Sequence, residues 1–184
     1  MKQELMIGIT ESGVMHTDAD PPISLDTKFQ MVKESGVYDY FDKTPLLELE
    51  DDYRQCSEKY ELPILAGGWF YVLGRDEDLL MENLRLGARL GSLVHNTQIM
   101  MDHQNGSLVS DEQVVEIYLR AYETGEACGC RPTFEVHVNM WSEDFRRIEK
   151  VADLVEKQGI PFRMTLDHSH VICLLYTSPS PRDS

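Results

Sequence analysis

A short segment in the C-terminal half carries side chains that can bind a metal ion or move a proton. Residues 133–139 read TFEVHVN. In a β-strand successive side chains point to opposite faces, so Glu135, His137 and Asn139 would share one face and the apolar residues between them the other. Stability alone does not predict a strand that is apolar on one face and carries a carboxylate and an imidazole on the other.

A second segment, PFRMTLDHSHVI over 161–172, shows the same alternation and ends in Asp167 and His170. If Glu135 and Asp167 are buried close together, each loses hydration and the two charges repel. A divalent cation compensates both costs, and carboxylates with imidazoles suit Mn, Mg, Zn, Co or Fe. We therefore predict a metal site with Glu135 and Asp167 as ligands. The alternatives are an ion pair of Glu135 with Arg163, and an Asx turn at Asp167 beside a solvated His170.

Three further side chains are candidate substrate contacts. His137 and Asn139 share the predicted face of Glu135, and Trp69 ends another predicted strand. An aromatic ring at a strand end can form an apolar wall for a sugar ring, although core packing explains Trp69 equally well. For His137, substrate contact and a structural hydrogen bond carry equal weight. His95 lies early in its strand, and we expect it to be a satisfied histidine in the core.

The chain as a whole predicts strands and helices in strict alternation. Apolar runs predict six strands, over 4–10, 37–44, 62–70, 92–100, 133–139 and 161–172, the last with its exit loop. Amphipathic stretches predict five helices, over 24–36, 45–61, 75–91, 110–129 and 142–159. This alternation indicates a parallel sheet covered by helices, either doubly wound or a (β/α)8 barrel. The first loop, GITESG, lacks the glycine spacing of a dinucleotide-binding turn.

Capping residues mark several of the predicted helix ends. Ser110 and Ser142 stand where helix N-caps are expected, and Gly36 follows a helix as its C-terminal stop. Pro45 suits the first turn of the second predicted helix.

The composition is that of an ordinary globular domain of 184 residues, with 42% hydrophobic and 27% charged residues. The formal charge is −15, and no run of Lys or Arg forms a basic patch. Nucleic acid and anionic membranes are disfavoured as partners, because both need clustered cations. No segment approaches the ~20 apolar residues of a membrane span, and we expect a cytoplasmic protein with its four cysteines reduced.

The segments FEVHVNMWSED and LDHSHVI, on the fifth and sixth predicted strands, resemble the xylose isomerase-like TIM barrel superfamily. This superfamily includes sugar phosphate isomerases and epimerases, inosose dehydratases and apurinic-site endonucleases. The resemblance covers residues 1–172 and implies an α/β fold, an incomplete (β/α)8 TIM barrel of about six strands and five helices. It also implies a divalent metal (Mn, Mg, Zn or Co) bound by a Glu, an Asp, a His and a Glu on strands five to eight. Glu135 and Asp167 match the first two ligands, and His170 matches a histidine that contacts substrate in the epimerases and metal in the endonucleases.

The resemblance implies a divalent-metal-dependent isomerase or epimerase of a sugar or sugar phosphate. Such enzymes polarise the substrate with the metal and move a proton beside it, which makes Glu135 and His170 the expected catalytic residues. His137, Asn139 and Trp69 would contact the substrate, and the protein could be a homo-oligomer. The alternatives are a dehydratase on the same scaffold, an endonuclease, against which the charge argues, and a non-catalytic barrel that binds a small molecule.

The last twelve residues, CLLYTSPSPRDS over 173–184, show no hydrophobic period. Their codons can be those of a transposon-type sequencing adapter read in frame, so we expect a non-native tail after residue 172. A disordered Ser/Pro tail is the alternative. The 172 remaining residues compare with about 250 in a typical barrel. The ligands of strands seven and eight would then be missing, and we expect the chain as given to be inactive.

Overall fold

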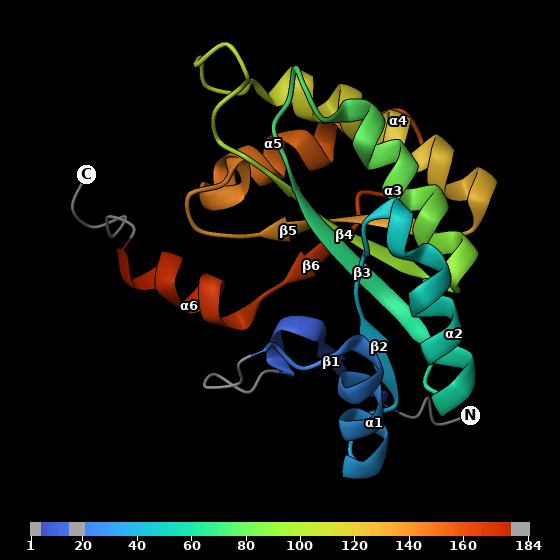
Figure 1. The fold of residues 1–184 in the computed structure, drawn as a ribbon. Coiled ribbons are helices and arrows are strands. Elements are labelled where there is room, and N and C mark those ends of the chain that lie inside the picture. The colour runs from blue at the N-terminus through green and yellow to red at the C-terminus, as the bar shows by residue number, and fades with distance from the viewer. Residues whose placement is uncertain (1–4, 15–20, 178–184) are drawn as a thin grey trace.

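The computed structural model describes residues 5–14 and 21–177, which form one sheet and its covering helices (Figure 1). The strands are β1 Gly8–Thr10, β2 Tyr40–Asp42, β3 Ile64–Tyr71, β4 Val94–Ile99, β5 Arg131–Val136 and β6 Met164–Leu166. The helices are α1 Leu25–Ser35, α2 Glu50–Tyr60, α3 Glu77–Leu90, α4 Asp111–Cys128, α5 Phe145–Glu156 and α6 His168–Thr177. Short 3-10 helices are η1 Glu11–Gly13, η2 Leu47–Leu49 and η3 Trp141–Glu143. Residues 178–184 of the expected tail lie outside the described residues.

The strands lie in the sheet in chain order, β1 to β6, and every neighbouring pair is parallel. Helices α1 to α5 return the chain between consecutive strands and cover the outer face of the curled sheet (Figure 1). A doubly wound sheet reverses its strand order at a switch point, and this sheet does not. The fold is therefore an incomplete (β/α)8 TIM barrel, as predicted. In this fold the carboxyl ends of the strands meet at one rim.

Two groups of apolar side chains hold the helices on the sheet. The larger core lies between strands β3 to β6 and helices α3 to α5, and includes Tyr118, Phe134 and Trp141. The smaller core lies between strands β1 to β3 and helices α1 and α2, where Phe29 and Phe41 stack with ring centroids 4.4 Å apart. Burial of each such side chain contributes about 1.5–3 kcal/mol. This packing holds each strand in place, and so sets the positions of the carboxyl ends of the strands that form the rim.

Two of the predicted helix ends are confirmed. Ser110 caps α4, because its hydroxyl accepts a hydrogen bond from the backbone N–H of Gln113 at 3.2 Å. The Gln113 side chain accepts in return from the Ser110 N–H at 2.9 Å, which completes a capping box. Gly36 ends α1 in the left-handed region, with φ of 64°.

Two other predicted helix ends are wrong. Ser142 does not cap α5; Asp144 does, through a hydrogen bond that its side chain accepts from the Arg146 N–H. Ser142 lies instead in η3, where it is 2% exposed. Pro45 is not in a first helical turn either, because α2 begins only at Glu50, after the 3-10 turn η2. In both places a short 3-10 helix precedes the α-helix, and the sequence pattern did not separate the two.

The last strand is shorter than the predicted 161–172, and a helix follows it. Asp167 Oδ1 accepts hydrogen bonds from the backbone N–H groups of Ser169 at 2.7 Å and His170 at 3.3 Å. Asp167 is thus the N-cap of α6, where an exit loop was expected. Helix α6 crosses the boundary expected after residue 172, and Leu174 within it is 2% exposed. In the part of the chain that the structure describes, every helix is too short or too polar to cross a membrane.

Candidate metal centre

Glu135 lies one residue before the end of β5 and is 6% exposed. In the β4–β5 register Asn96 lies opposite Thr133, two residues before Glu135, so all three side chains point to the inner face of the sheet. Asn96 Nδ2 donates to Glu135 Oε2 at 2.7 Å, and Gln98 Nε2 donates to the same oxygen. Two amides therefore hold one oxygen of the carboxylate, and Oε1 accepts no hydrogen bond from a described residue.

Arg163 does not pair with Glu135. Its Nη1 lies 3.5 Å from Glu126 Oε1, and its guanidinium carbon lies 5.3 Å from the centre of the Tyr122 ring. Within the described residues, the partners of the Glu135 carboxylate are thus neutral amides rather than a cation. Two amides leave its negative charge in place and available to a bound ion.

The chain turns directly after β5, so His137 and Asn139 do not continue the strand alternation that predicted their positions. The backbone N–H of His137 donates to Ser142 Oγ at 3.2 Å, and the same hydroxyl donates to the Glu135 carbonyl. Ser142, expected only as a helix cap, thereby fixes the turn that carries His137. Asn139 has a φ of 61°, in the left-handed region; it is exposed, and its backbone N–H donates to Glu143 Oε2 at 2.6 Å.

The imidazoles of His137 and His170 meet beside Glu135. His137 Nδ1 lies 2.6 Å from the Val138 carbonyl oxygen. Since a carbonyl only accepts, Nδ1 carries the proton and Nε2 keeps a free lone pair. The ring of His170, from the first turn of α6, has its centroid 3.7 Å from that of His137. Ligand atoms of Glu135, His137 and His170 all lie within 4.8 Å of one another.

This set of donors fits a divalent ion. Bonds of about 2.0–2.2 Å to nitrogen and oxygen place the ligand atoms of one zinc ion roughly 3–4 Å apart. The ligand atoms of the three residues, within 4.8 Å of one another, lie at or slightly beyond that spacing. The hydrogen bond from His137 to a backbone carbonyl is the outer contact that metal-binding histidines make. One carboxylate and two imidazoles suit Zn, Co, Mn or Fe.

Asp167 lies next to this group but outside it. Its Oδ1 caps α6, and its Oδ2 lies 3.7 Å from His170 Nε2. Hydrogen bonds from the Ser169 hydroxyl and backbone N–H lower the pKa of Asp167 below its usual value. In this position the Asp167 carboxylate faces the His170 ring without a hydrogen bond to it.

A second carboxyl group, which the sequence did not indicate, lies at the end of β2. Burial raises the pKa of Asp42, and the charge of Glu135 raises it further. A carboxyl group that holds its proton more tightly than usual can donate or accept a proton near neutral pH. The available signal was the polar ending of the second predicted strand, residues 37–44.

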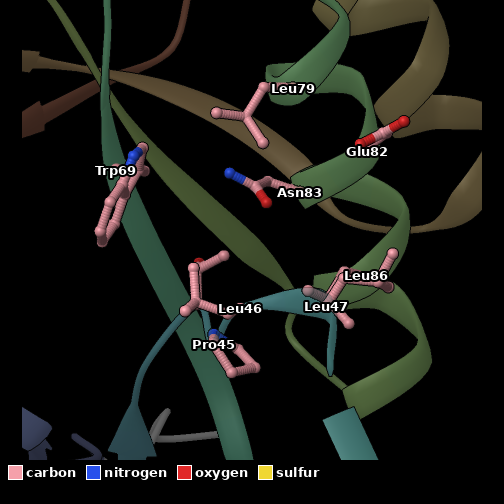
Figure 2. Close-up of a pocket in the computed structure, with 9 residues that line it drawn as sticks. Pro45, Leu46, Leu47, Trp69, Leu79, Glu82, Asn83 and Leu86 are labelled. Atoms are coloured by element: carbon pink, nitrogen blue, oxygen red, sulfur yellow. The ribbon is translucent and has the colours of Figure 1, made fainter. Parts of the chain in front are cut away.

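Trp69 and Phe70, successive residues of β3, lie on opposite faces of the sheet. Trp69 lines a pocket on the outer, helix-covered face together with Leu79 and Asn83 of α3 (Figure 2). The Phe70 ring lies edge-on to His137, with centroids 6.2 Å apart, and is 47% exposed. Phe70, and not Trp69, is thus the aromatic residue at this strand end that faces the candidate metal centre.

His95 is a core histidine, as expected. Its Nε2 lies 2.6 Å from the Tyr71 hydroxyl and its Nδ1 3.3 Å from Thr44 Oγ1. Burial lowers the pKa of His95 to about 3. Neutral and with a partner on both ring nitrogens, it belongs to the contact between the sheet and the outer layer.

No protein-family model and no curated protein matches the chain. Among solved structures, the probable 3-DHS dehydratase AsbF of Bacillus anthracis matches with TM-score 0.64 and 14% identity, over 92% of this chain and 65% of its own. The 3-keto-D-glucoside 4-epimerase YcjR of E. coli gives 0.67 and 12%, over 92% and 70%. The IolI protein, solved with a zinc atom, gives 0.58 and 14%, over 86% and 62%.

The fold is that of the xylose isomerase-like TIM barrels. Identities of 12 to 14% show the fold of this chain and not its activity. The chain spans 62 to 70% of the length of these three proteins. The activity, substrate and partners of the whole protein are therefore matters for proposal.

Proposed function

We propose that Glu135, His137 and His170 bind a divalent metal ion in an isomerase or epimerase that acts on a sugar or a related polyol. The observation that carries the proposal is the convergence of one carboxylate and two imidazoles at the carboxyl-end rim, where TIM-barrel enzymes hold their active sites. Two neighbours of the same fold support it, one named as an epimerase of a keto-glucoside and one solved with zinc.

Each residue of the site has a role in this proposal. A bound divalent ion would polarise a carbonyl or hydroxyl oxygen of the substrate. Glu135, held through Oε2 by Asn96 and Gln98, directs Oε1 to the ion or to a substrate proton. Asp42, with its raised pKa, exchanges a proton from the β2 side. Phe70 presents an apolar ring to the carbon face of the sugar.

The sequence predicts Asp167 as a ligand, and we propose that it acts instead as the carboxylate that orients His170. A carboxylate beside a metal-binding histidine is a common outer partner. The substitution Asp167→Asn separates the two roles, because Asn retains the oxygen that caps α6 and loses only the charge. We expect a fall in zinc affinity of about tenfold for an orienting role. A loss as complete as that of Glu135→Gln would make Asp167 a ligand.

Zinc and manganese titrations of the purified chain by calorimetry test the metal site itself. We expect one site, weakened at least about tenfold by Glu135→Gln or His170→Asn. His168→Asn is the matched control, since His168 is exposed in the same turn of α6. Zinc affinity that is unchanged in Glu135→Gln and His170→Asn would contradict the assignment.

Proton exchange from D2O tests the reaction. Isomerases and epimerases that move a proton at carbon incorporate solvent deuterium into their substrate, and NMR detects it. With the seventh and eighth strands of the barrel present, we expect exchange in an aldose, ketose or keto-sugar from a panel, dependent on added metal and lost in Glu135→Gln. Metal binding without exchange in any sugar would favour the non-catalytic alternative, and loss of water from the substrate would assign a dehydratase.

A further inference from the structure

A pocket of about 160 Å³ lies on the outer face of the sheet, between β3, the chain after β2 and helix α3 (Figure 2). It is separate from the candidate metal centre, because Trp69 lines it while the adjacent Phe70 faces His137 on the inner face. Its size is below the roughly 300–1,000 Å³ of sites for drug-sized ligands. It therefore has room for a molecule of about one ring.

The walls of the pocket include large apolar side chains that are not buried in either core. Trp69 is 42% exposed, and Leu46 and Leu79 are 56% and 38% exposed. Figure 2 shows Trp69 on one side of the pocket, Leu79 and Asn83 on the other, and Leu46 beside Pro45. A flat apolar molecule between the indole and the leucines would cover surface that is now in contact with water.

The Asn83 carboxamide, a polar group in the pocket wall, is held in place by a buried hydrogen bond. Asn83 is 8% exposed, and its Nδ2 donates to the Tyr71 hydroxyl at 2.8 Å. That hydroxyl in turn lies 2.6 Å from Nε2 of the buried His95, whose Nδ1 reaches Thr44, another residue of the pocket wall. Since Asn83 Nδ2 is held by the Tyr71 hydroxyl through one of its two N–H groups, the orientation of the carboxamide is fixed, and Oδ1 is the oxygen that it offers to the pocket. The pocket thus presents a pre-oriented hydrogen-bond acceptor on an apolar wall.

Charge narrows the class of ligand further. Glu82 is among the lining residues, although Figure 2 shows its carboxylate pointing away from Trp69, and the described lining residues include no Lys or Arg. An anion would therefore meet the Asn83 amide oxygen with no cation to compensate it. A neutral hydrogen-bond donor is complementary to that oxygen.

We propose that this pocket binds a one-ring aromatic molecule that carries an O–H or N–H donor and no negative charge. The ring packs against the Trp69 indole, and the donor bonds to Asn83 Oδ1. This inference does not depend on the proposed metal-dependent function, because the pocket shares no side chain with the Glu135 group.

A titration of the 15N-labelled chain with three probes tests the ligand chemistry. Phenol has the ring and the donor, anisole has the ring without the donor, and benzoate adds the charge. The chain has two indole N–H signals, and Trp141, 1% exposed in the larger core, is the internal control for Trp69. We expect phenol to shift the Trp69 signal alone, with an affinity about three- to tenfold above that of anisole, and benzoate to bind least. Equal affinity for phenol and anisole, or a shift at Trp141 alone, overturns the proposal.

Variants locate the site without relying on the probes alone. Trp69→Ala should abolish the phenol response of the Asn83 side-chain amide, Trp69→Phe should restore part of it, and Phe70→Ala, on the opposite face, should leave it unchanged. If Trp69→Ala does not fold, Leu79→Trp, which fills the pocket, should remove phenol binding with Trp69 in place. Phenol binding that survives Leu79→Trp would overturn the proposal. So would a concentration-dependent dimer, found by sedimentation, that buries Trp69 and excludes phenol.

Discussion

At the scale of single residues, the candidate metal centre is organised around one oxygen of Glu135. Asn96 and Gln98 both donate to Oε2, so the carboxylate cannot rotate freely and Oε1 keeps one direction. Asn96 Oδ1 is buried without a partner among the described residues. An unpaired buried acceptor costs about 1–3 kcal/mol, and a hydroxyl of a bound molecule would satisfy it. The amide of Asn96 thus connects the carboxylate to the space where a substrate would lie.

Loss of the Asn96 amide should weaken metal binding without unfolding the chain. In Asn96→Leu the carboxylate loses one of its two donors, and we expect zinc affinity to fall about tenfold, as for other outer-sphere partners. Calorimetric zinc titration measures the change. Thr97→Val is the control, because Thr97 is the next residue of β4, is 1% exposed and faces away from Glu135. An equal loss in both variants would mean that β4 itself has been disturbed.

Sequence reasoning reached Glu135 because strand alternation holds up to that residue. His137 lies beyond the end of β5 and joins the site through the turn that Ser142 fixes. Strand alternation does not predict where a side chain in such a turn will lie. Asn96 and Gln98 were missed, although two amides at alternate positions of a strand are the same signal that singled out Glu135. Tertiary pairing of β4 with β5, and not local pattern, brings them to the carboxylate.

At the scale of elements, Glu11 joins the first two strand–helix units. It lies in η1, directly after β1, and its carboxylate binds Lys28 of α1 at 2.6 Å and Lys43 after β2 at 2.7 Å. The Tyr53 hydroxyl of α2 donates to the same carboxylate at 2.8 Å. Burial alone would raise the pKa of Glu11, but these three partners outweigh it and lower the pKa to about 2.

The free energy of unfolding should therefore depend on Glu11 between about pH 4.5 and pH 2. In this range the unfolded chain binds a proton that the folded chain does not, so the contribution is present above pH 4.5 and is lost on acidification. Its size is at most about 3 kcal/mol. Urea unfolding of wild type and Glu11→Gln from pH 7 to pH 2.5 measures it. We expect the two curves to converge at low pH, and a constant separation would contradict the ion-pair account.

His95 should make the free energy of unfolding depend on pH in a higher range than Glu11 does. It joins β4 to β3 and α3 as a neutral ring. Its pKa is lowered by burial to about 3, whereas an unfolded chain titrates near 6.5. The unfolded state therefore binds more protons between these values, and stability should fall as pH drops below about 6.5. In His95→Gln this part of the slope should disappear between pH 6.5 and pH 4.5. A slope unchanged from wild type would mean that His95 is charged in the folded state.

The sequence predicts the order and type of the first five strands and helices, because each has its own apolar period. It misses α6, whose start is an Asp167 cap inside a segment expected to be strand and loop. The apolar residues of this segment do not follow one buried face. Leu166, Ile172 and Leu175 are 60%, 54% and 66% exposed, while Leu174 is buried. Only the position of α6 after β6 brings His170 to His137.

At the scale of the whole molecule, the half-barrel has two cores on one sheet. In the described chain β1 and β6 each pair with one neighbour, so the sheet has two free edges. The smaller core, around Phe29 and Phe41, depends on the edge unit and on the Glu11 ion pairs, while the larger core is covered by three helices. The two ends of the sheet should therefore differ in local stability.

Loss of the Glu11 charge should open the N-terminal unit before the larger core. In Glu11→Gln at pH 7 the ion pairs with Lys28 and Lys43 are lost, whereas Asp111 still joins α4 to Arg147 and Lys150 of α5. Hydrogen–deuterium exchange with mass spectrometry, compared between Glu11→Gln and wild type at pH 7, should show protection falling in α1 and α2 while α4 and α5 remain protected. Because both units share β3, a uniform loss of protection is the opposing outcome, and it would make the half-barrel a single cooperative unit despite its divided core.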